Sequence, residues 1–200
     1  MRFAFELALS RPRRHLTMVT KSNAQRHGMV LWDKVFYEVA AEFEGRVTHD
    51  KMLVDAMTVR MVMRPESLDV VVATNLHADI LSDLAAALSG SIGIAPSSNL
   101  CPTREFPSMF EPIHGSAPDI AGKGIANPVG AFWSAAEMVR WLAGHGDGED
   151  KGMLEAADLL MTAIENVCEA GTRTKDLGGS SGTKEVTDAV CKEIEKLAKR

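Results

Sequence analysis

The sequence lacks the features that mark several large classes of protein. Only 3 of its 200 residues are cysteines, and their wide spacing fits neither a disulfide framework nor a paired-cysteine metal or redox motif. We therefore expect a reduced, cytoplasmic setting. Charged residues interrupt every apolar run before the roughly 18 residues that span a bilayer, and Glu6 lies inside the only candidate export signal. The sequence thus predicts neither a membrane protein nor an exported one.

An excess of positive charge is also absent. The chain has 22 Lys and Arg residues against 27 Asp and Glu, a formal net charge of −5, so it would repel phosphate backbones and anionic lipids. Nucleic acid and membrane surfaces are therefore poor candidates as partners. The 6 histidines show no zinc-ligand spacing. With 46% hydrophobic residues, the composition is that of an ordinary globular protein with one domain or two small ones.

Apolar periodicity predicts alternating helices and strands, and therefore the α/β class. After a first helix that ends near residue 10, we expect helices at 31–43, 52–63, 75–88, 129–143, 153–170 and 184–199. Strands are expected at 15–19, 46–49, 69–73 and 108–113. Glycine and proline become frequent between residues 91 and 128, which indicates extended loops and a domain boundary near Gly90. A polar exposed loop is expected at 144–150.

Three carboxylates in the first half could hold a cation. Asp79 and Asp83 stand four residues apart on one predicted helix, so they project from the same face and repel each other. Two explanations fit equally well: a hard divalent cation with oxygen ligands, or a solvated polar stripe. Asp55 has apolar neighbours, from which we expect it to be buried, and a buried carboxylate requires a cationic partner.

Lys21 directly follows the apolar segment 15–19, at the place where open α/β sheets present their chemistry. A lysine there can hold a carboxylate or exchange a proton, although a surface lysine at a strand end is the more frequent case. The basic residues between positions 11 and 15 could bind an anion, but a solvated turn is the better interpretation.

The segment 109–128 is the most informative part of the sequence. It matches neither a GxGxxG fingerprint nor a GxxxxGK[ST] phosphate loop. It offers a ring in His114, a carboxylate in Asp119 and an amide in Asn127. These groups suit an adenosine, because they could stack on a base, accept ribose hydroxyls and bond a base edge. The later segment 177–183 could touch phosphates, although a helix-entry turn is the stronger interpretation.

Five segments in a fixed order carry a family resemblance. They are TKSNA (20–24), VDAM (54–57), NLHADILSDLAAALSGSIG (75–93), FEPIHGSAPDIAGKGIANP (110–128) and LGGSSGT (177–183). Together they resemble the metal-dependent β-decarboxylating dehydrogenases, the family of isocitrate and isopropylmalate dehydrogenases. The residues at 20–28 and 75–78 are most similar to the tartrate and D-malate dehydrogenase branch.

The resemblance implies roles for residues of the first half. Asp79 and Asp83 would bind Mg²⁺ or Mn²⁺ in one subunit, while Lys21 and Asp55 would contribute to the neighbouring subunit's site, with Asp55 a third metal ligand. Active sites would then be shared across a homodimer. Lys21 would manage the proton of the substrate hydroxyl, and Asn23 would touch substrate or nicotinamide.

The resemblance also implies a cofactor and an activity. The matching positions of the family's adenosine loop, which would bind NAD, are His114, Gly115, Ser116, Ala117, Asp119 and Asn127. The implied reaction is NAD- and Mg²⁺- or Mn²⁺-dependent oxidation, with or without decarboxylation, of a 2-hydroxy diacid such as tartrate or D-malate. An isopropylmalate-type substrate is an alternative within the same enzyme class.

The resemblance begins part-way along the family's pattern. Residues 1–90 would form most of the smaller, dimer-forming α/β domain, and 91–200 the carboxy-terminal part of the larger nucleotide-binding domain. The family's amino-terminal segment, with its substrate-binding arginines and catalytic tyrosine, has no counterpart, and Tyr37 lies outside that tyrosine's motif. We therefore expect a partial isocitrate/isopropylmalate dehydrogenase-like fold with little turnover on its own. A noncatalytic remnant that dimerises and binds a cation or nucleotide is the second hypothesis.

Overall fold

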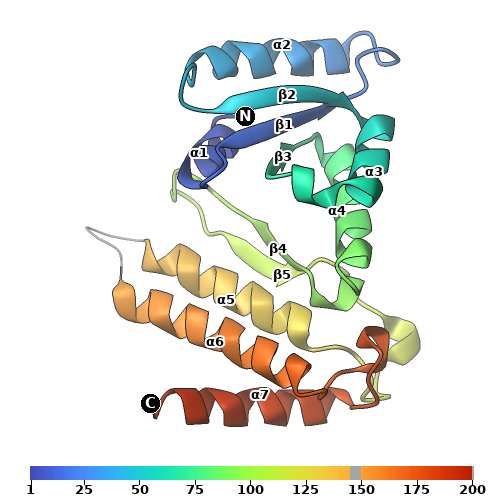
Figure 1. Cartoon of the computed structure of the whole chain (residues 1–200), viewed down its shortest axis with the longest axis vertical. Coiled ribbons are helices and arrows are strands. Elements are labelled where there is room, and N and C mark those ends of the chain that lie inside the picture. The colour runs from blue at the N-terminus through green and yellow to red at the C-terminus, as the bar shows by residue number, and fades with distance from the viewer. Residues whose placement is uncertain (145–149, 200) are drawn as a thin grey trace. The chain divides into compact units, whose positions relative to one another are not determined.

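The chain divides along its sequence into two compact units, with the boundary between Leu88 and Ser89. A computed structural model describes residues 1–144 and 150–199, so most of the loop expected at 144–150 lies outside the described residues. The units are Met1–Leu88 and Ser89–Arg200 (Figure 1). No helix among the described residues is both long enough and apolar enough to cross a membrane.

The first unit is built on a three-stranded parallel sheet. Its strands are β1 (His15–Thr20), β2 (Thr48–Leu53) and β3 (Val70–Val72), in the order β2-β1-β3. Every residue of β1 after His15 is buried, because β1 is the central strand and pairs on both sides. Since all three strands run in the same direction, the segments that follow them leave from one edge of the sheet.

Four helices cover the sheet of the first unit. They are α1 (Arg2–Ser10), α2 (Gly28–Ala41), α3 (Val54–Met63) and α4 (Asn75–Leu88). Successive side chains of a strand point to opposite faces, and β1 accordingly serves two cores. Leu16 and Met18 pack with residues of α1 and α2, including Phe5, whereas Val19 packs with Met57 and other residues of α3 and α4.

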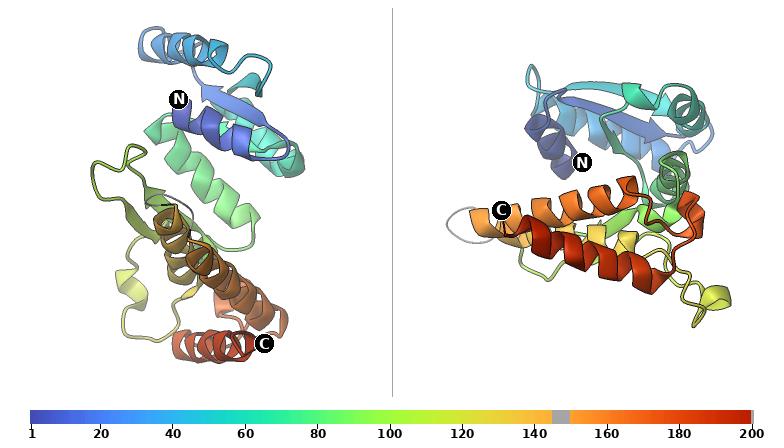
Figure 2. Two further views of the ribbon diagram at one scale, coloured as in Figure 1. Left: turned by 90° about the vertical axis from the view of Figure 1, so that its left-hand side faces the viewer. Right: turned by 60° about the horizontal axis from the view of Figure 1, so that its bottom comes forward.

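The second unit combines a short strand pair with three helices. Strands β4 (Pro96–Asn99) and β5 (Met109–Pro112) are antiparallel. Helices α5 (Val129–Ala143), α6 (Lys151–Glu169) and α7 (Thr183–Leu197) lie side by side, as Figures 1 and 2 show. Their shared core is apolar and consists of Val129, Ala163, Ile164, Val167, Val186 and Val190.

The α/β class is confirmed, but several element boundaries differ from those expected. The strand expected at 46–49 runs from Thr48 to Leu53 instead, and the following helix begins at Val54 rather than at residue 52. β2 is an edge strand whose residues are exposed or half-buried. Its sequence is therefore polar, and no apolar alternation marks it as a strand. The helix expected to start at residue 31 begins at Gly28. β4 was not expected, because PSSN carries no apolar residue.

Candidate functional site

Lys21 and Asp55 meet at the carboxyl edge of the parallel sheet. Lys21 follows β1, and Asp55 lies in the first turn of α3, directly after the neighbouring strand β2. The Lys21 Nζ donates a short hydrogen bond to Asp55 Oδ1. This hydrogen bond is the main reason why the pKa of Asp55 lies below its usual 3.8. The chain thus places a proton donor and acceptor together at an edge where α/β proteins bind ligands.

Asp55 is exposed, so the expectation that it is buried is wrong. Its side chain keeps 66% of its accessible surface, whereas Met57 two residues later is fully buried. Residues two positions apart lie on different sides of a helix, and α3 turns Met57 rather than Asp55 toward the core. The partner of Asp55 is therefore an accessible ammonium rather than a cation enclosed in the core.

Asn23 lies in the exposed turn that follows Lys21. The carbonyl oxygen of Lys21 accepts hydrogen bonds from the backbone N–H groups of Ala24 and Gln25, both at 2.9 Å, and so closes this turn. The Asn23 side chain is exposed, which leaves it accessible beside Lys21.

Asp33 supports the same turn, and the sequence analysis did not single it out. Its residue is 9% exposed, and its Oδ2 accepts a hydrogen bond of 2.9 Å from Lys51 Nζ. Burial opposes ionisation of Asp33, but interactions with Ser22, Thr20 and Lys51 outweigh it, so the pKa is lowered. Thr20 and Ser22 flank Lys21 in the chain. A buried aspartate in an otherwise apolar helical pattern is the signal that could have revealed it.

Asp79 and Asp83 lie on the exposed face of α4, as their spacing predicts. His77 and Leu81 occupy the opposite face and are buried at 6% and 4% exposure. Within residues 1–88, which are all described, no ion pair or side-chain hydrogen bond engages either carboxylate. Among the described residues of the whole chain, no group of three His, Cys, Asp or Glu side chains is close enough to hold a metal. One chain therefore presents a pair of open carboxylates and not a complete metal site.

The segment predicted to bind adenosine is an open loop of the second unit. Between β5 and α5 the chain forms turns and a short 3₁₀ helix, Pro118–Ile120, that carries Asp119. His114, Gly115 and Asp119 are all exposed, as are Ser116 and Ala117. Gly115 has a φ of 60°, a left-handed conformation that favours glycine. The side chains are thus accessible to a ligand.

Asn127 differs from the rest of this loop because both ends of its amide are engaged. Its Oδ1 accepts a hydrogen bond of 3.0 Å from the N–H of Val129 in the first turn of α5. Its Nδ2 donates to Asp176 Oδ2 at 2.8 Å. Asp176 lies 49 residues further along the chain, so the sequence gives no local sign of this contact.

The segment 177–183 forms a helix-entry turn, the stronger of the two interpretations of its sequence. The Gly182 N–H donates to Glu185 Oε2 at 2.9 Å, which is one half of a capping box at the start of α7. Thr183 holds the loop that is predicted to bind adenosine: its N–H donates to the carbonyl of Gly124 at 2.8 Å, and its Oγ1 donates to that of Ala126 at 2.5 Å.

The basic turn at 11–15 is held by contacts within its own unit. Arg13 donates to the carbonyl oxygens of residues 66–68 at 2.7 to 2.9 Å, and Arg11 Nε donates to Asp69 Oδ1 at 2.5 Å. These guanidinium groups fasten the turn to the segment before β3. The structure therefore favours a turn over an anion site.

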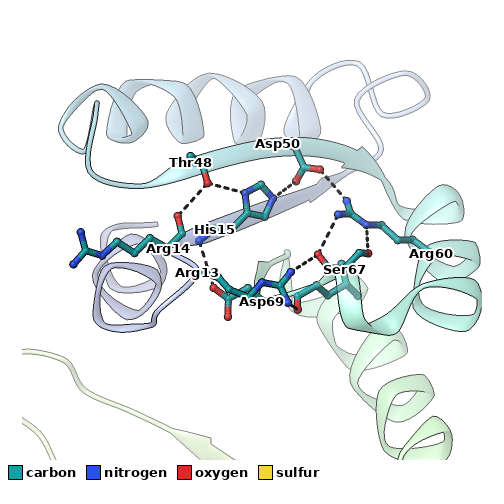
Figure 3. Close-up of polar contacts among 9 residues, drawn as sticks. Arg13, Arg14, His15, Thr48, Asp50, Arg60, Ser67 and Asp69 are labelled. Carbon is teal, nitrogen blue, oxygen red and sulfur yellow. Dashed lines mark hydrogen bonds and ion pairs between the residues drawn. The ribbon is translucent and has the colours of Figure 1, made fainter.

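A polar network crosses the amino edge of the same sheet (Figure 3). His15 lies between Thr48 Oγ1, 2.9 Å from its Nδ1, and Asp50 Oδ1, 3.3 Å from its Nε2. Arg60 donates to Asp50 Oδ2 and to Ser67 Oγ, each at 2.8 Å. These contacts join β1, β2 and α3 at the edge opposite Lys21. They therefore support the fold of the unit and lie outside the candidate site.

A comparison with known families identifies the family of the chain. The family model described as isocitrate/isopropylmalate dehydrogenase matches residues 1–190. The chain belongs to this family. A crystal structure of isocitrate dehydrogenase from Methylococcus capsulatus superimposes with a TM-score of 0.86 at 36% identity, over 96% of this chain and 54% of that one. The isocitrate/isopropylmalate dehydrogenase fold predicted from the sequence is thus confirmed as a partial one.

The curated relatives point to one branch of the family. A probable tartrate dehydrogenase/decarboxylase of Agrobacterium vitis is 63% identical over 194 residues, which are 97% of this chain and 51% of the relative. The D-malate dehydrogenase [decarboxylating] of Escherichia coli strain K12 is 50% identical over 194 residues, 97% of this chain and 52% of the relative. The chain spans about half the length of these relatives.

Proposed function

We propose that the chain is part of an NAD-dependent dehydrogenase that oxidises a 2-hydroxy diacid of the tartrate or D-malate type with the help of Mg²⁺ or Mn²⁺. The observation that carries this proposal is the Lys21–Asp55 pair at the carboxyl edge of the sheet. It occurs in a chain whose relatives, at 63% and 50% identity, are named tartrate dehydrogenase/decarboxylase and D-malate dehydrogenase.

The donor set of α4 fits a divalent cation. Asp79 and Asp83 offer carboxylate oxygens one helical turn apart, and both are exposed. Oxygen-only ligands favour Mg²⁺ or Mn²⁺ over zinc. When bound, the cation would act as a Lewis acid toward substrate oxygens. Both aspartates lack a competing cationic side chain within residues 1–88, which keeps them available.

Lys21 and Asp55 would handle the proton of the substrate hydroxyl. The Asp55 carboxylate holds the Lys21 Nζ in place through the hydrogen bond between them. In its neutral form the Lys21 amine would accept the proton of the substrate hydroxyl, and NAD, when bound, would supply the hydride acceptor. Asn23, in the adjoining turn, would bind substrate or nicotinamide.

The second unit would bind the adenosine half of NAD through the loop after β5. His114 would contact the base, Asp119 the ribose hydroxyls and Asn127 a base edge, with Gly115, Ser116 and Ala117 lining the loop. The exposure of the loop side chains supports this assignment. A carboxylate at the ribose would repel a 2′-phosphate, so Asp119 favours NAD over its phosphorylated analogue.

A second copy of the chain would complete the metal site. Helices α3 and α4 pack on each other and leave large apolar side chains exposed, namely Val59, Val62, Met63, Leu76 and Ile80. Leu76 and Ile80 share the face of α4 that carries Asp79 and Asp83. A homodimer that covers this face would bury the apolar residues and bring one chain's carboxylates to the partner's Lys21 and Asp55. The first unit would then be the dimer-forming domain, and the second would be part of the nucleotide-binding domain.

The test follows NADH absorbance with tartrate, D-malate or isopropylmalate in the presence of Mn²⁺. Because the relatives are about twice as long, the remaining half of the E. coli relative is added as a separate polypeptide. We expect turnover of tartrate or D-malate when both halves are present, little with the 200-residue chain alone, and none with Lys21→Ala. Preference for isopropylmalate would move the chain to that substrate class. Binding of Mn²⁺ and NAD without turnover would identify a noncatalytic remnant.

A further inference from the structure

We propose that Asp176 is a positioning residue that fixes the orientation of the Asn127 amide, and thereby sets which base edge the nucleotide loop recognises. This inference rests on the proposed function, because it concerns the same NAD site. The additional residue, Asp176, lies outside the loop, in the turn before α7.

Asp176 accepts hydrogen bonds from three segments of the second unit. Its Oδ2 accepts from Ser91 Oγ at 2.5 Å and from Asn127 Nδ2 at 2.8 Å. Its Oδ1 accepts from Thr174 Oγ1 at 2.6 Å. Ser91 and Thr174 are 7% and 1% exposed, so two buried hydroxyls hold the carboxylate in place. Asp176 is itself exposed, so these hydrogen bonds, rather than enclosure in a core, hold its carboxylate in place.

The backbone at Gly93 lies close to this carboxylate. A Cβ on Gly93 would lie 3.0 Å from Asp176 Oδ2 and 3.0 Å from the Cβ of Asn127. The Gly93 N–H also donates to Ser91 Oγ at 2.9 Å, which directs the Ser91 hydroxyl proton toward Asp176. Any larger residue at position 93 would press on both side chains where they meet, so glycine favours this contact.

The two partners of Asn127 allow only one orientation of its amide. Oδ1 faces the N–H of Val129, and Nδ2 faces the Asp176 carboxylate. A flipped amide would place its NH₂ against the Val129 N–H and its oxygen against the carboxylate, so both hydrogen bonds would become repulsive.

The protonation state of Asp176 reinforces this orientation. Burial opposes its ionisation, but hydrogen bonds from Ser91, Thr174 and Asn127 outweigh that effect and hold its pKa below 3.8. At neutral pH the group therefore only accepts hydrogen bonds, and it requires a donor from Asn127.

The held amide keeps the groups that an adenine edge requires. An asparagine amide has two N–H donors and two acceptor lone pairs. One donor is used by Asp176 and one lone pair by Val129, so one of each remains. Adenine offers an acceptor at N1 and a donor at N6, which is the complementary pair. Hypoxanthine offers the reverse, a donor at N1 and an acceptor at O6. Fixing the amide would thus make the loop prefer adenine.

The binding experiment compares NAD with nicotinamide hypoxanthine dinucleotide by calorimetry on the full chain. We expect NAD to bind at least about tenfold more tightly, since a mispaired hydrogen bond costs about 1–3 kcal/mol. Asp176→Asn should reduce this preference to about twofold or less, because an amide at position 176 can turn its NH₂ toward residue 127 and donate to the oxygen of a flipped Asn127 amide. Asp158→Asn, which alters a surface ion pair with Arg140, is the matched control and should keep the wild-type preference.

A double-mutant cycle separates positioning from a general loss of structure. If Asp176 acts through Asn127, then Asp176→Asn should not change the base preference further in an Asn127→Ala background. An equal effect of Asp176→Asn in both backgrounds would overturn the proposal. Unchanged base preference in Asp176→Asn would overturn it as well, while NAD binding by wild type would leave the proposed function standing.

A measurement without ligand tests the inference even if the chain binds no NAD. Failure to bind NAD would count against the proposed function alone. The side-chain NH₂ resonances of Asn127 are assigned by their loss in Asn127→Asp. We expect one of the two protons to be shifted downfield by the carboxylate and to return toward its partner in Asp176→Asn. If Asp176→Asn unfolds, Ser91→Ala serves instead, since it removes one support of the carboxylate and should produce a smaller change of the same sign. Resonances that do not move in the folded variant would contradict the contact.

Discussion

The carboxylates of the two units are used in opposite ways. Asp79 and Asp83 in the first unit are exposed, and no side-chain hydrogen bond within residues 1–88 engages them. Asp176 in the second unit receives three side-chain hydrogen bonds. A carboxylate that already accepts several side-chain hydrogen bonds fixes the structure around it, whereas an open pair remains available for a ligand. The hydrogen-bond environment, rather than the residue type, thus separates positioning groups from candidate metal ligands.

Both units contain acids that stabilise the fold in their ionised form. In the first unit, hydrogen bonds and ion pairs outweigh burial and lower the pKa of Asp33, Asp50 and Asp69. In the second unit the same balance lowers the pKa of Asp176. Protonation of these carboxylates should therefore destabilise the unit that holds them.

The largest expected effect comes from the aromatic core of the first unit. Phe36 is fully buried, with its ring 5.2 Å from that of Phe5. Phe36→Ala should lower the free energy of unfolding of the first unit by about 3–5 kcal/mol, through lost burial and the cavity left behind. Hydrogen exchange, measured as urea is raised, would show which unit loses stability. Tyr37→Ala, at a neighbouring position that is 48% exposed, is the control. An equal loss of protection in both units would show that they unfold as one body.

Acid should destabilise the first unit through protonation of Asp69. Arg11 and the His15 N–H bond to Asp69 and hold its pKa below 3.8 despite burial. A lowered pKa means that the stabilisation is complete above the unfolded value and is lost as pH falls through the folded one. Asp69→Asn should therefore cost about 1.5 kcal/mol at pH 6, as a hydrogen bond to a half-exposed guanidinium does, and nothing below the folded pKa.

The measurement is the unfolding free energy of wild type and Asp69→Asn between pH 2 and pH 7. The two curves should converge at low pH. A constant difference across this range would show that protonation of Asp69 does not contribute to the loss of stability in acid.

Asp119 should set the cofactor preference in the second unit. Asp119→Asn removes the like charge that a 2′-phosphate would meet, so the preference for NAD over NADP should fall by about tenfold. Calorimetric titration with both dinucleotides measures this ratio, with Asp158→Asn as the control. Tighter binding of NADP than of NAD by the wild type would show that Asp119 does not contact the ribose.

The smallest effect is expected at a surface ion pair of the second unit. Asp158 accepts a hydrogen bond of 2.8 Å from Arg140, but its side chain is 72% exposed. Asp158→Asn should change the unfolding free energy by less than about 0.5 kcal/mol. A loss above about 1 kcal/mol in urea unfolding would mean that exposure is a poor guide to the value of charges in this unit.

The sequence predicted those elements whose pattern is local. α4 was expected at 75–88 and runs from Asn75 to Leu88, because its apolar face is periodic and Gly90 follows its end. β2 and β4 were misplaced or missed, since THDKML and PSSN contain few apolar residues and are held mainly by pairing with a neighbouring strand. An edge strand of this kind is specified by its partner rather than by its own composition.

The same distinction between local pattern and contacts between elements applies to the candidate site. The shared face of Asp79 and Asp83 followed from their spacing on one helix. The contact between Lys21 and Asp55 depends on β1 and β2 being neighbours in the sheet, which the sequence alone does not specify. The expectation that Asp55 is buried is wrong because apolar neighbours in the sequence do not determine which side of the helix faces the core.

The most direct test of the account is a calorimetric titration of Mn²⁺ into the wild-type chain, Asp79→Asn and Asp188→Asn. Asp188 is a helical aspartate already paired with Lys184 at 2.7 Å, so it is the matched control. If the open carboxylates of α4 are metal ligands, Asp79→Asn should bind Mn²⁺ at least about tenfold more weakly, since one ligand and one charge are lost. Asp188→Asn should match wild type. Equal Mn²⁺ affinity for wild type and Asp79→Asn would contradict the proposed metal site.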